Sequence, residues 1–189
     1  MSGMHRYKND DAWPASRTFA AAMLVALAIC LFAFLHFWQS VEAVEASYLY
    51  GVGAPTSFNF SRSVVFFGLG RSNGYGLRIT PECCSALLIA PAALLSALLT
   101  VRRRVRVRRI FGGFGAATLL LLLSNQVRLG VIAWSIGEFG LAKGFEWGHA
   151  VIGSVVSLVF AAASLAILAW IALGEERNNV PRGNDVNSI

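Results

Sequence analysis

Three side chains that can take part in covalent catalysis lie far apart in the sequence: the thiol of Cys84, the guanidinium of Arg128 and the imidazole of His149. The thiolate is the reactive form of cysteine, and an adjacent cation lowers the pKa of a thiol. Histidine can take the thiol proton and return it to a leaving amine, and arginine can donate hydrogen bonds to the oxyanion of a tetrahedral intermediate. Brought together, these groups would form a nucleophilic site for acyl transfer.

Each of the three residues also has a purely structural interpretation. Cys84 is compatible with a small buried apolar side chain, which is the commonest role of a free cysteine. Arg128 is compatible with a membrane anchor whose guanidinium reaches the phosphate headgroups. His149 is compatible with an interfacial residue bonded to the backbone at a helix start. A functional site therefore depends on whether the fold brings the three residues to one place.

The composition is typical of an integral membrane protein. The 189 residues have a mean hydropathy of +0.60, and 56% of them are apolar. A soluble domain of this length needs more polar surface to cover its core. Because the tails are short and no linker is evident, we expect a single membrane domain over residues 17–174, with tails at 1–16 and 175–189.

Apolar stretches predict an all-α fold with about four transmembrane helices. They begin near Phe19, Cys84, Ile110 and His149, and the first, second and last end near Trp38, Val101 and Leu173. Stretches of about 20 apolar residues are long enough to cross a bilayer. A cleaved signal peptide is the alternative for the first stretch, but its apolar part is longer than a typical signal core.

Residues 41–80 separate the first and second apolar stretches and are rich in glycine. Two short apolar runs, 63–67 and 76–80, flank a turn signal at Asn73-Gly74. This pattern predicts a short β-like segment, because strands of a hairpin are bounded by such turn residues. Residues 135–148 are interpreted as a polar connection before the last apolar stretch.

Six arginines within eight positions set the expected orientation. They are Arg102, Arg103, Arg104, Arg106, Arg108 and Arg109. Between two apolar stretches, such a run is typical of a cytoplasmic loop in contact with anionic lipid, rather than of a nucleic-acid site. Both tails would then be cytoplasmic, and residues 41–82 and 129–148 would lie outside the cell membrane, which the chain crosses several times.

This topology places the three reactive residues at one depth. Cys84 opens the second apolar stretch at its outer end, and His149 opens the last one. Arg128 lies about 18 residues beyond the start of the third stretch, or roughly 27 Å along a helix, which is close to the hydrocarbon thickness. We therefore expect a Cys84–Arg128–His149 site on the extracytoplasmic side.

The remaining cysteines and histidines suggest neither a disulfide framework nor a metal site. Three cysteines, two of them adjacent, do not form paired bridges. His5 and His36 have no ligand-like partners in the sequence, so no metal or other cofactor is expected. Cys83 and Cys84 leave a thiol oxidoreductase open as an alternative, although the spacing differs from the usual redox motif.

Three motifs, in order, resemble those of the exosortase and archaeosortase family. Residues 79–87 (ITPECCSAL) resemble its cysteine motif, 125–129 (NQVRL) its Asn-x-x-Arg segment, and 149–153 (HAVIG) its His-x-x-x-Gly segment. The similarity covers roughly residues 45–165 and includes the basic loop after the cysteine helix. Ala86 replaces the glycine of the family motif, and the chain is short beside many exosortases.

The resemblance implies a membrane cysteine protease or transpeptidase. Its substrates would be membrane proteins that carry a recognition motif, a transmembrane helix and a basic tail at the C-terminus. Cys84 would be the nucleophile, Arg128 the oxyanion or thiolate stabiliser and His149 the acid and base, while Asn125 would orient Arg128 or the substrate. A non-catalytic membrane scaffold is the other interpretation left open.

Overall fold

The computed structural model describes residues 15–51, 56–69, 74–102 and 105–174 of the chain. Almost all of the two predicted tails, 1–16 and 175–189, lies outside the described residues. Asn73 of the expected turn lies outside them too, as do Arg103 and Arg104 of the basic run.

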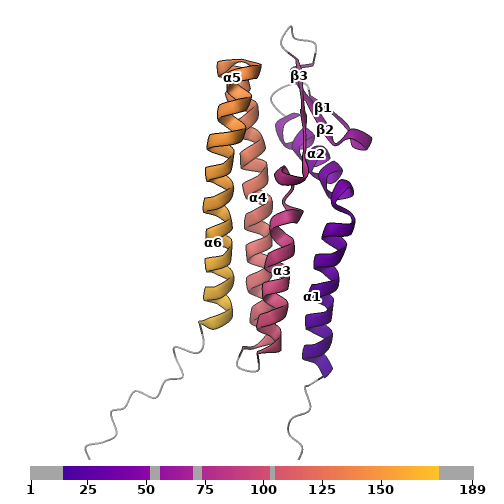
Figure 1. The fold of residues 1–189 in the computed structure, drawn as a ribbon, viewed down its shortest axis with the longest axis vertical. Coiled ribbons are helices and arrows are strands. Elements are labelled where there is room, and N and C mark those ends of the chain that lie inside the picture. The colour runs from indigo at the N-terminus through magenta and orange to yellow at the C-terminus, as the bar shows by residue number, and fades with distance from the viewer. Residues whose placement is uncertain (1–14, 52–55, 70–73, 103–104, 175–189) are drawn as a thin grey trace, which may run out of the picture.

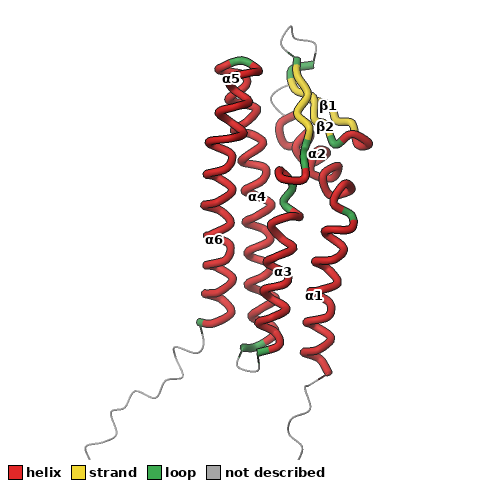
Figure 2. The backbone as a smooth tube through the Cα atoms, viewed as in Figure 1, coloured by secondary structure: helices red, strands yellow, loops and turns green. Residues whose placement is uncertain are grey.

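Helices make up most of the described chain (Figures 1 and 2). The α-helices are α1 (Ala15–Ala33), α2 (Leu35–Gly51), α3 (Ala86–Val101), α4 (Val107–Phe139), α5 (Leu141–Phe145) and α6 (Gly153–Leu173). Single-turn 3-10 helices span Phe60–Arg62 and Pro81–Cys83, and a π-helix, Glu146–Ile152, joins α5 to α6.

Three helical segments are long and apolar enough to cross a membrane. They are Ala15–Ala33, Val107–Phe139 and Leu141–Ala172, the last of which runs through α5, the π-helix and α6. The fourth apolar helix, α3, has 16 residues, or about 24 Å of helix. The mostly helical fold is thus confirmed, with three segments long and apolar enough to cross a membrane, and the expected count of four is not confirmed.

The four long apolar helices lie side by side, with α1 against α3, α3 against α4, and α4 against α6 (Figure 1). Alanines and other small residues fill the contacts between them, including Ala28, Ala93 and Ala117. Large apolar side chains point outward instead: Leu158 is 72% exposed and Trp170 is 76% exposed. This inside-out distribution suits a bundle surrounded by lipid, where helices associate through small residues.

A three-stranded antiparallel sheet lies between α2 and α3 in the chain. Its strands are β1 (Thr56–Asn59), β2 (Val64–Phe67) and β3 (Tyr75–Arg78), in the order β1-β2-β3. The short β-like segment expected between the first two membrane helices is therefore present. β2 and β3 overlap the two predicted runs, and β1 was not predicted, because its TSFN sequence has little of the expected apolar character.

Two other segments differ from the sequence prediction. The first apolar helix ends at Ala33, and α2 continues from Leu35 to Gly51, into the glycine-rich stretch that was expected to contain the β-like segment. The polar connection expected at 135–148 is mostly helical, because α4 runs on to Phe139 before Gly140, which has a positive φ of 79°. Isolated glutamates and lysines do not end a helix that packs against its neighbours.

The two ends of the bundle have different character (Figure 1). The sheet, α2 and α5 lie at one end, which we call the sheet end. The turn between α3 and α4 lies at the other end, with the start of α1 and the end of α6. A hydrogen bond from Arg17 Nη1 to the carbonyl of Arg102 (3.0 Å) fixes α1 to that turn.

Gly144 in α5 packs directly against the backbone of α4. A Cβ at Gly144 would lie 2.2 Å from the Ser135 carbonyl oxygen, whereas a Cβ at Gly137 would meet nothing within 4 Å. We expect Gly144→Ala to lower the free energy of unfolding by about 2 kcal/mol or more through overpacking. Gly137→Ala, the matched control, should be neutral or stabilising by up to about 1 kcal/mol. Thermal unfolding in detergent micelles measures both, and equal melting temperatures for the two variants would contradict the close packing.

Candidate active site

The two adjacent cysteines lie where the sheet joins the bundle. Pro81 begins a single 3-10 turn, Cys83 ends it, and Cys84 has an extended backbone (φ −91°, ψ 130°) before α3 begins. This extended residue sends the two side chains in different directions. Cys83 packs in the cluster formed by the sheet, α2 and α4, and Cys84 packs in the cluster between the bundle helices.

His149 contacts Cys83 rather than Cys84. The distance between Cys83 Sγ and His149 Nε2 is 3.2 Å, within hydrogen-bond range for sulfur. His149 lies in the π-helix, and its ring stacks on that of Phe145 with centroids 5.1 Å apart. A π-turn is a local widening of a helix that often occurs at functional sites. The sequence prediction paired His149 with Cys84, so the structure brings the imidazole to the neighbouring thiol.

Arg128 is buried from α4 (7% exposed) next to this pair. Its Nη1 donates to the carbonyl of Glu82 (3.2 Å) and lies 3.4 Å from Ser157 Oγ. Arg128 and His149 are close enough to interact electrostatically. The guanidinium therefore lies beside the backbone of the residue before Cys83 and near the imidazole.

Part of the Arg128 guanidinium has no partner. Its Nε is buried and makes no hydrogen bond, and within the described residues no carboxylate forms an ion pair with Arg128. Arg128 can lie here because residue 153 is glycine: a Cβ there would lie 3.0 Å from Arg128 Nε. A buried donor without a partner is destabilising, so it is a natural binding point for an anionic or oxyanionic group.

A fourth polar group, Glu42 from α2, is also buried here (3% exposed). Its Oε1 accepts hydrogen bonds from the backbone N–H of Ser85 (2.8 Å) and from the Ser85 hydroxyl. Its Oε2 accepts from Asn125 Nδ2 (2.8 Å). Asn125 was expected to orient Arg128 or the substrate, but its amide instead holds Glu42.

The Glu42 carboxylate is bound to Ser85, the residue after Cys84, and so lies close enough to the Cys84 thiol to act on its pKa. Burial and the Glu42 carboxylate together raise the pKa of Cys84 to about 12. Burial likewise raises the pKa of Glu42 to about 7, although the hydrogen bonds from Ser85 act in the opposite direction. Cys84 is therefore a protonated thiol at rest, next to a carboxylate that titrates near neutral pH.

The Glu42 pKa predicts an unusual pH dependence of stability. Between the ordinary value of 4.5 and about 7, the folded protein keeps a proton on Glu42 that the unfolded chain has lost. The free energy of unfolding should therefore fall as the pH rises through this window, by up to about 3 kcal/mol. Glu42→Gln should remove this dependence and be more stable than the wild type above pH 7.

Thermal unfolding in micelles at several pH values tests this expectation. Glu45→Gln, on the same helix, is the matched control because Glu45 bonds Gln126 at an exposed position (3.2 Å) and should leave the slope unchanged. A wild-type melting temperature that rises from pH 4.5 to 7, or a Glu42→Gln variant with the same profile as the wild type, would contradict the assigned burial.

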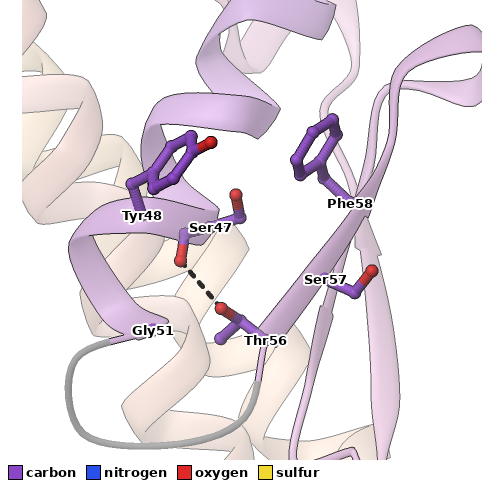
Figure 3. Close-up of a pocket in the computed structure, with 6 residues that line it drawn as sticks. All are labelled: Ser47, Tyr48, Gly51, Thr56, Ser57 and Phe58. Carbon is purple, nitrogen blue, oxygen red and sulfur yellow. Dashed lines mark hydrogen bonds between the residues drawn. The ribbon is translucent and has the colours of Figure 1, made fainter.

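The described residues include no candidate metal site, and the open pocket that the structure shows lies apart from this cluster. Within the described ranges, no group of three or more histidine, cysteine or acidic side chains could hold a metal ion. An open pocket of about 400 Å³ lies between the end of α2 and β1 (Figure 3). Its lining residues are Ser47, Tyr48, Gly51, Thr56, Ser57 and Phe58, none of which belongs to the predicted site.

Sequence reasoning missed Glu42, Ser85 and the contact made by Cys83. A signal for Glu42 exists in the sequence. Small residues at Ser40, Ala43, Ala46 and Ser47 surround it with helical spacing, and the structure buries all four. A glutamate on a small-residue face of a helix is expected to be buried and hydrogen-bonded, because an unpaired buried charge is costly.

Comparison with known proteins adds no family assignment. No family model, curated protein or solved structure matches the chain. A function must therefore be inferred from the cluster of Glu42, Cys83, Cys84, Arg128 and His149, which we call the thiol cluster.

Proposed function

We propose that this chain is a membrane-embedded cysteine protease or transpeptidase that processes C-terminal sorting signals of exported proteins. The observation that carries the proposal is the thiol cluster itself. Two thiols, an imidazole and a partly unpartnered guanidinium from three distant segments meet at the sheet end of an apolar bundle. Structural roles alone would not require a buried arginine without an ion pair.

In the proposed reaction, Cys84 attacks the carbonyl carbon of the scissile peptide bond and forms a thioester. Arg128 donates hydrogen bonds to the oxyanion, a role supported by its unpartnered Nε. His149 takes the thiol proton of Cys84 and returns it to the leaving amine, a role compatible with its place beside Cys83. Water or an acceptor amine then releases the product from Cys84.

The proposed substrates are membrane proteins with a C-terminal motif, a transmembrane helix and a basic tail, as the family resemblance implies. The large apolar side chains on the outside of the bundle suit a substrate helix that approaches through lipid. We further propose that α3 is the fourth span and that the sheet end lies outside the cell membrane. The arginines of the α3–α4 turn support this orientation.

Removing the gene from the source organism tests the function directly. C-terminal proteomics of the membrane fraction should then find exported proteins that retain a C-terminal helix and basic tail, and expression of the wild-type chain should restore cleavage. Identical C-termini with and without the gene would overturn the proposed function.

The orientation makes a separate prediction about chemical labelling. With Cys30→Ser as background, an impermeant maleimide added to intact cells should label Ser57→Cys in β1, which is exposed at the sheet end. Arg108→Cys, exposed near the basic turn, should be labelled only after the membrane is permeabilised. The buried native thiols of Cys83 and Cys84 should react slowly in both cases. The reverse labelling pattern would contradict the proposed orientation.

A further inference from the structure

Glu42 is a buried carboxylate to which the proposed reaction assigns no role. It connects three parts of the thiol cluster: α2, which carries it, the start of α3 through Ser85, and α4 through Asn125. Because Ser85 follows Cys84, the bond to Ser85 also holds the Glu42 carboxylate beside Cys84, whose thiol it influences electrostatically. None of these neighbours is a cation that would compensate a buried negative charge, so the arrangement lowers stability above neutral pH.

A structural role explains only part of this arrangement. A carboxylate that accepts the Ser85 N–H satisfies a free donor at the start of α3 and interacts favourably with the helix dipole. A neutral serine or asparagine serves the same purpose without burying a charge. A helix cap, however, does not require a thiol beside the carboxylate.

We propose that Glu42 is the proton acceptor that activates Cys84. The inference rests on the proposed acyl-transfer function. It assigns the first proton transfer to Glu42 instead of His149. The geometry supports this choice, since His149 Nε2 lies against Cys83 Sγ, while the Glu42 carboxylate is bound to Ser85, the residue after Cys84. A general base must be within hydrogen-bond reach of the proton that it takes.

The proton balance of the step is complete. As Cys84 Sγ forms a bond to the scissile carbonyl carbon, its proton passes to the Glu42 carboxylate, and the carbonyl π electrons move to the oxygen held by Arg128. Collapse of the tetrahedral intermediate breaks the C–N bond, and the leaving amine takes this proton back from the now neutral Glu42, directly or relayed by His149. No oxidant, reductant or cofactor enters the step.

The surroundings of Glu42 suit a base that works near neutral pH. Burial raises its pKa to about 7, so it is ionised in a substantial fraction of molecules and still basic enough to accept a proton. The titratable groups that act on it are Glu45 on its own helix and Cys84 before α3, and α4 contributes the neutral amide of Asn125. Ser85 and Asn125 are positioning residues that fix both carboxylate oxygens.

Glu42→Gln tests the proposal with two reagents on the purified protein in micelles, on a Cys30→Ser background. p-Nitrophenyl acetate acylates a thiol in a step that a base can assist, and mass spectrometry identifies the acylated cysteine. Iodoacetamide alkylates the thiolate, so its rate reports the thiolate fraction and the accessibility of the thiol and needs no proton acceptor. We expect Glu42→Gln to slow acylation of Cys84 by about a hundredfold. Alkylation of Cys84 should be unchanged or faster, because a neighbouring negative charge is gone.

Glu45→Gln is the matched control, since it makes the same substitution on the same helix and its amide partner, Gln126, adjoins Asn125. In Glu45→Gln, the rates of acylation and of alkylation of Cys84 should both be unchanged. The pH profile gives a second readout: wild-type acylation should rise through about pH 7, and the Glu42→Gln profile should lack this rise. Melting temperatures establish that both variants are folded.

Three results would overturn the role of Glu42: unchanged acylation in Glu42→Gln, equal slowing of acylation and alkylation, or an acyl group on Cys83 instead of Cys84. The third result would leave a thiol protease in place with His149 as its base. The proposed function fails separately if cells without the gene process their C-terminal signals normally.

Discussion

Cells that carry Cys84→Ser in place of the wild-type chain are expected to accumulate exported proteins with uncleaved C-terminal helices. A hydroxyl is a far weaker nucleophile than a thiol at neutral pH, and loss of a nucleophile lowers turnover by about three orders of magnitude or more. Serine is close in size to cysteine, and Cys84 is 2% exposed in a well-packed cluster, so the fold should survive. C-terminal proteomics of the membrane fraction measures the uncleaved fraction.

Cys83→Ser is the matched control for this experiment, because it makes the same change one residue earlier. We expect it to retain most of the processing, with a modest loss from the broken contact to His149. Loss of processing only in Cys83→Ser would make the Cys83–His149 pair the reactive one. A requirement for both thiols would favour a thiol oxidoreductase, and a requirement for neither would favour a scaffold.

Arg128→Lys is expected to lower processing by about a hundredfold or more, although the positive charge is kept. An ammonium group cannot reproduce the several fixed donors of a guanidinium, which in Arg128 reach Glu82 and leave Nε free. Removal of one oxyanion donor typically costs a factor of about 10²–10³ in turnover. The uncleaved fraction of C-terminal helices in complemented cells gives the measurement.

Arg78→Lys, at an exposed position of β3, is the control for Arg128→Lys. It should process substrates normally, since its side chain lies outside the thiol cluster. If Arg128→Lys is equally active and its protein level matches that of the wild type, Arg128 does not stabilise an oxyanion, and anchoring at the membrane surface becomes the better explanation.

The convergence of Arg128 and His149 beside the cysteines was predictable from the sequence because it depends on helix length. A rise of 1.5 Å per residue relates position in an apolar stretch to depth, so residues at the outer ends of three stretches meet in one layer. The mostly helical fold and the position of the small sheet follow from the same apolar pattern and from the glycines between residues 51 and 76.

The pairing within the cluster was not predictable, since it depends on side-chain direction. The extended backbone of Cys84 rotates it away from Cys83, and the π-turn at His149 shifts the imidazole relative to a regular helix. Sequence spacing specifies neither feature. Glu42 was missed because a polar residue after an apolar stretch is usually exposed, whereas here α2 packs against α4 and the sheet and encloses it.

The short length of α3 has a consequence for the surrounding lipid. At about 24 Å it is about 6 Å shorter than the hydrocarbon layer of a typical bilayer, and Cys84 comes just before its first turn. In a membrane, either the acyl chains compress around this helix or the thiol lies beneath the headgroups. In both cases lipid chain length would set how easily water reaches the proposed thioester on Cys84. The membrane would thereby influence whether an acyl-enzyme is hydrolysed or survives to meet an amine.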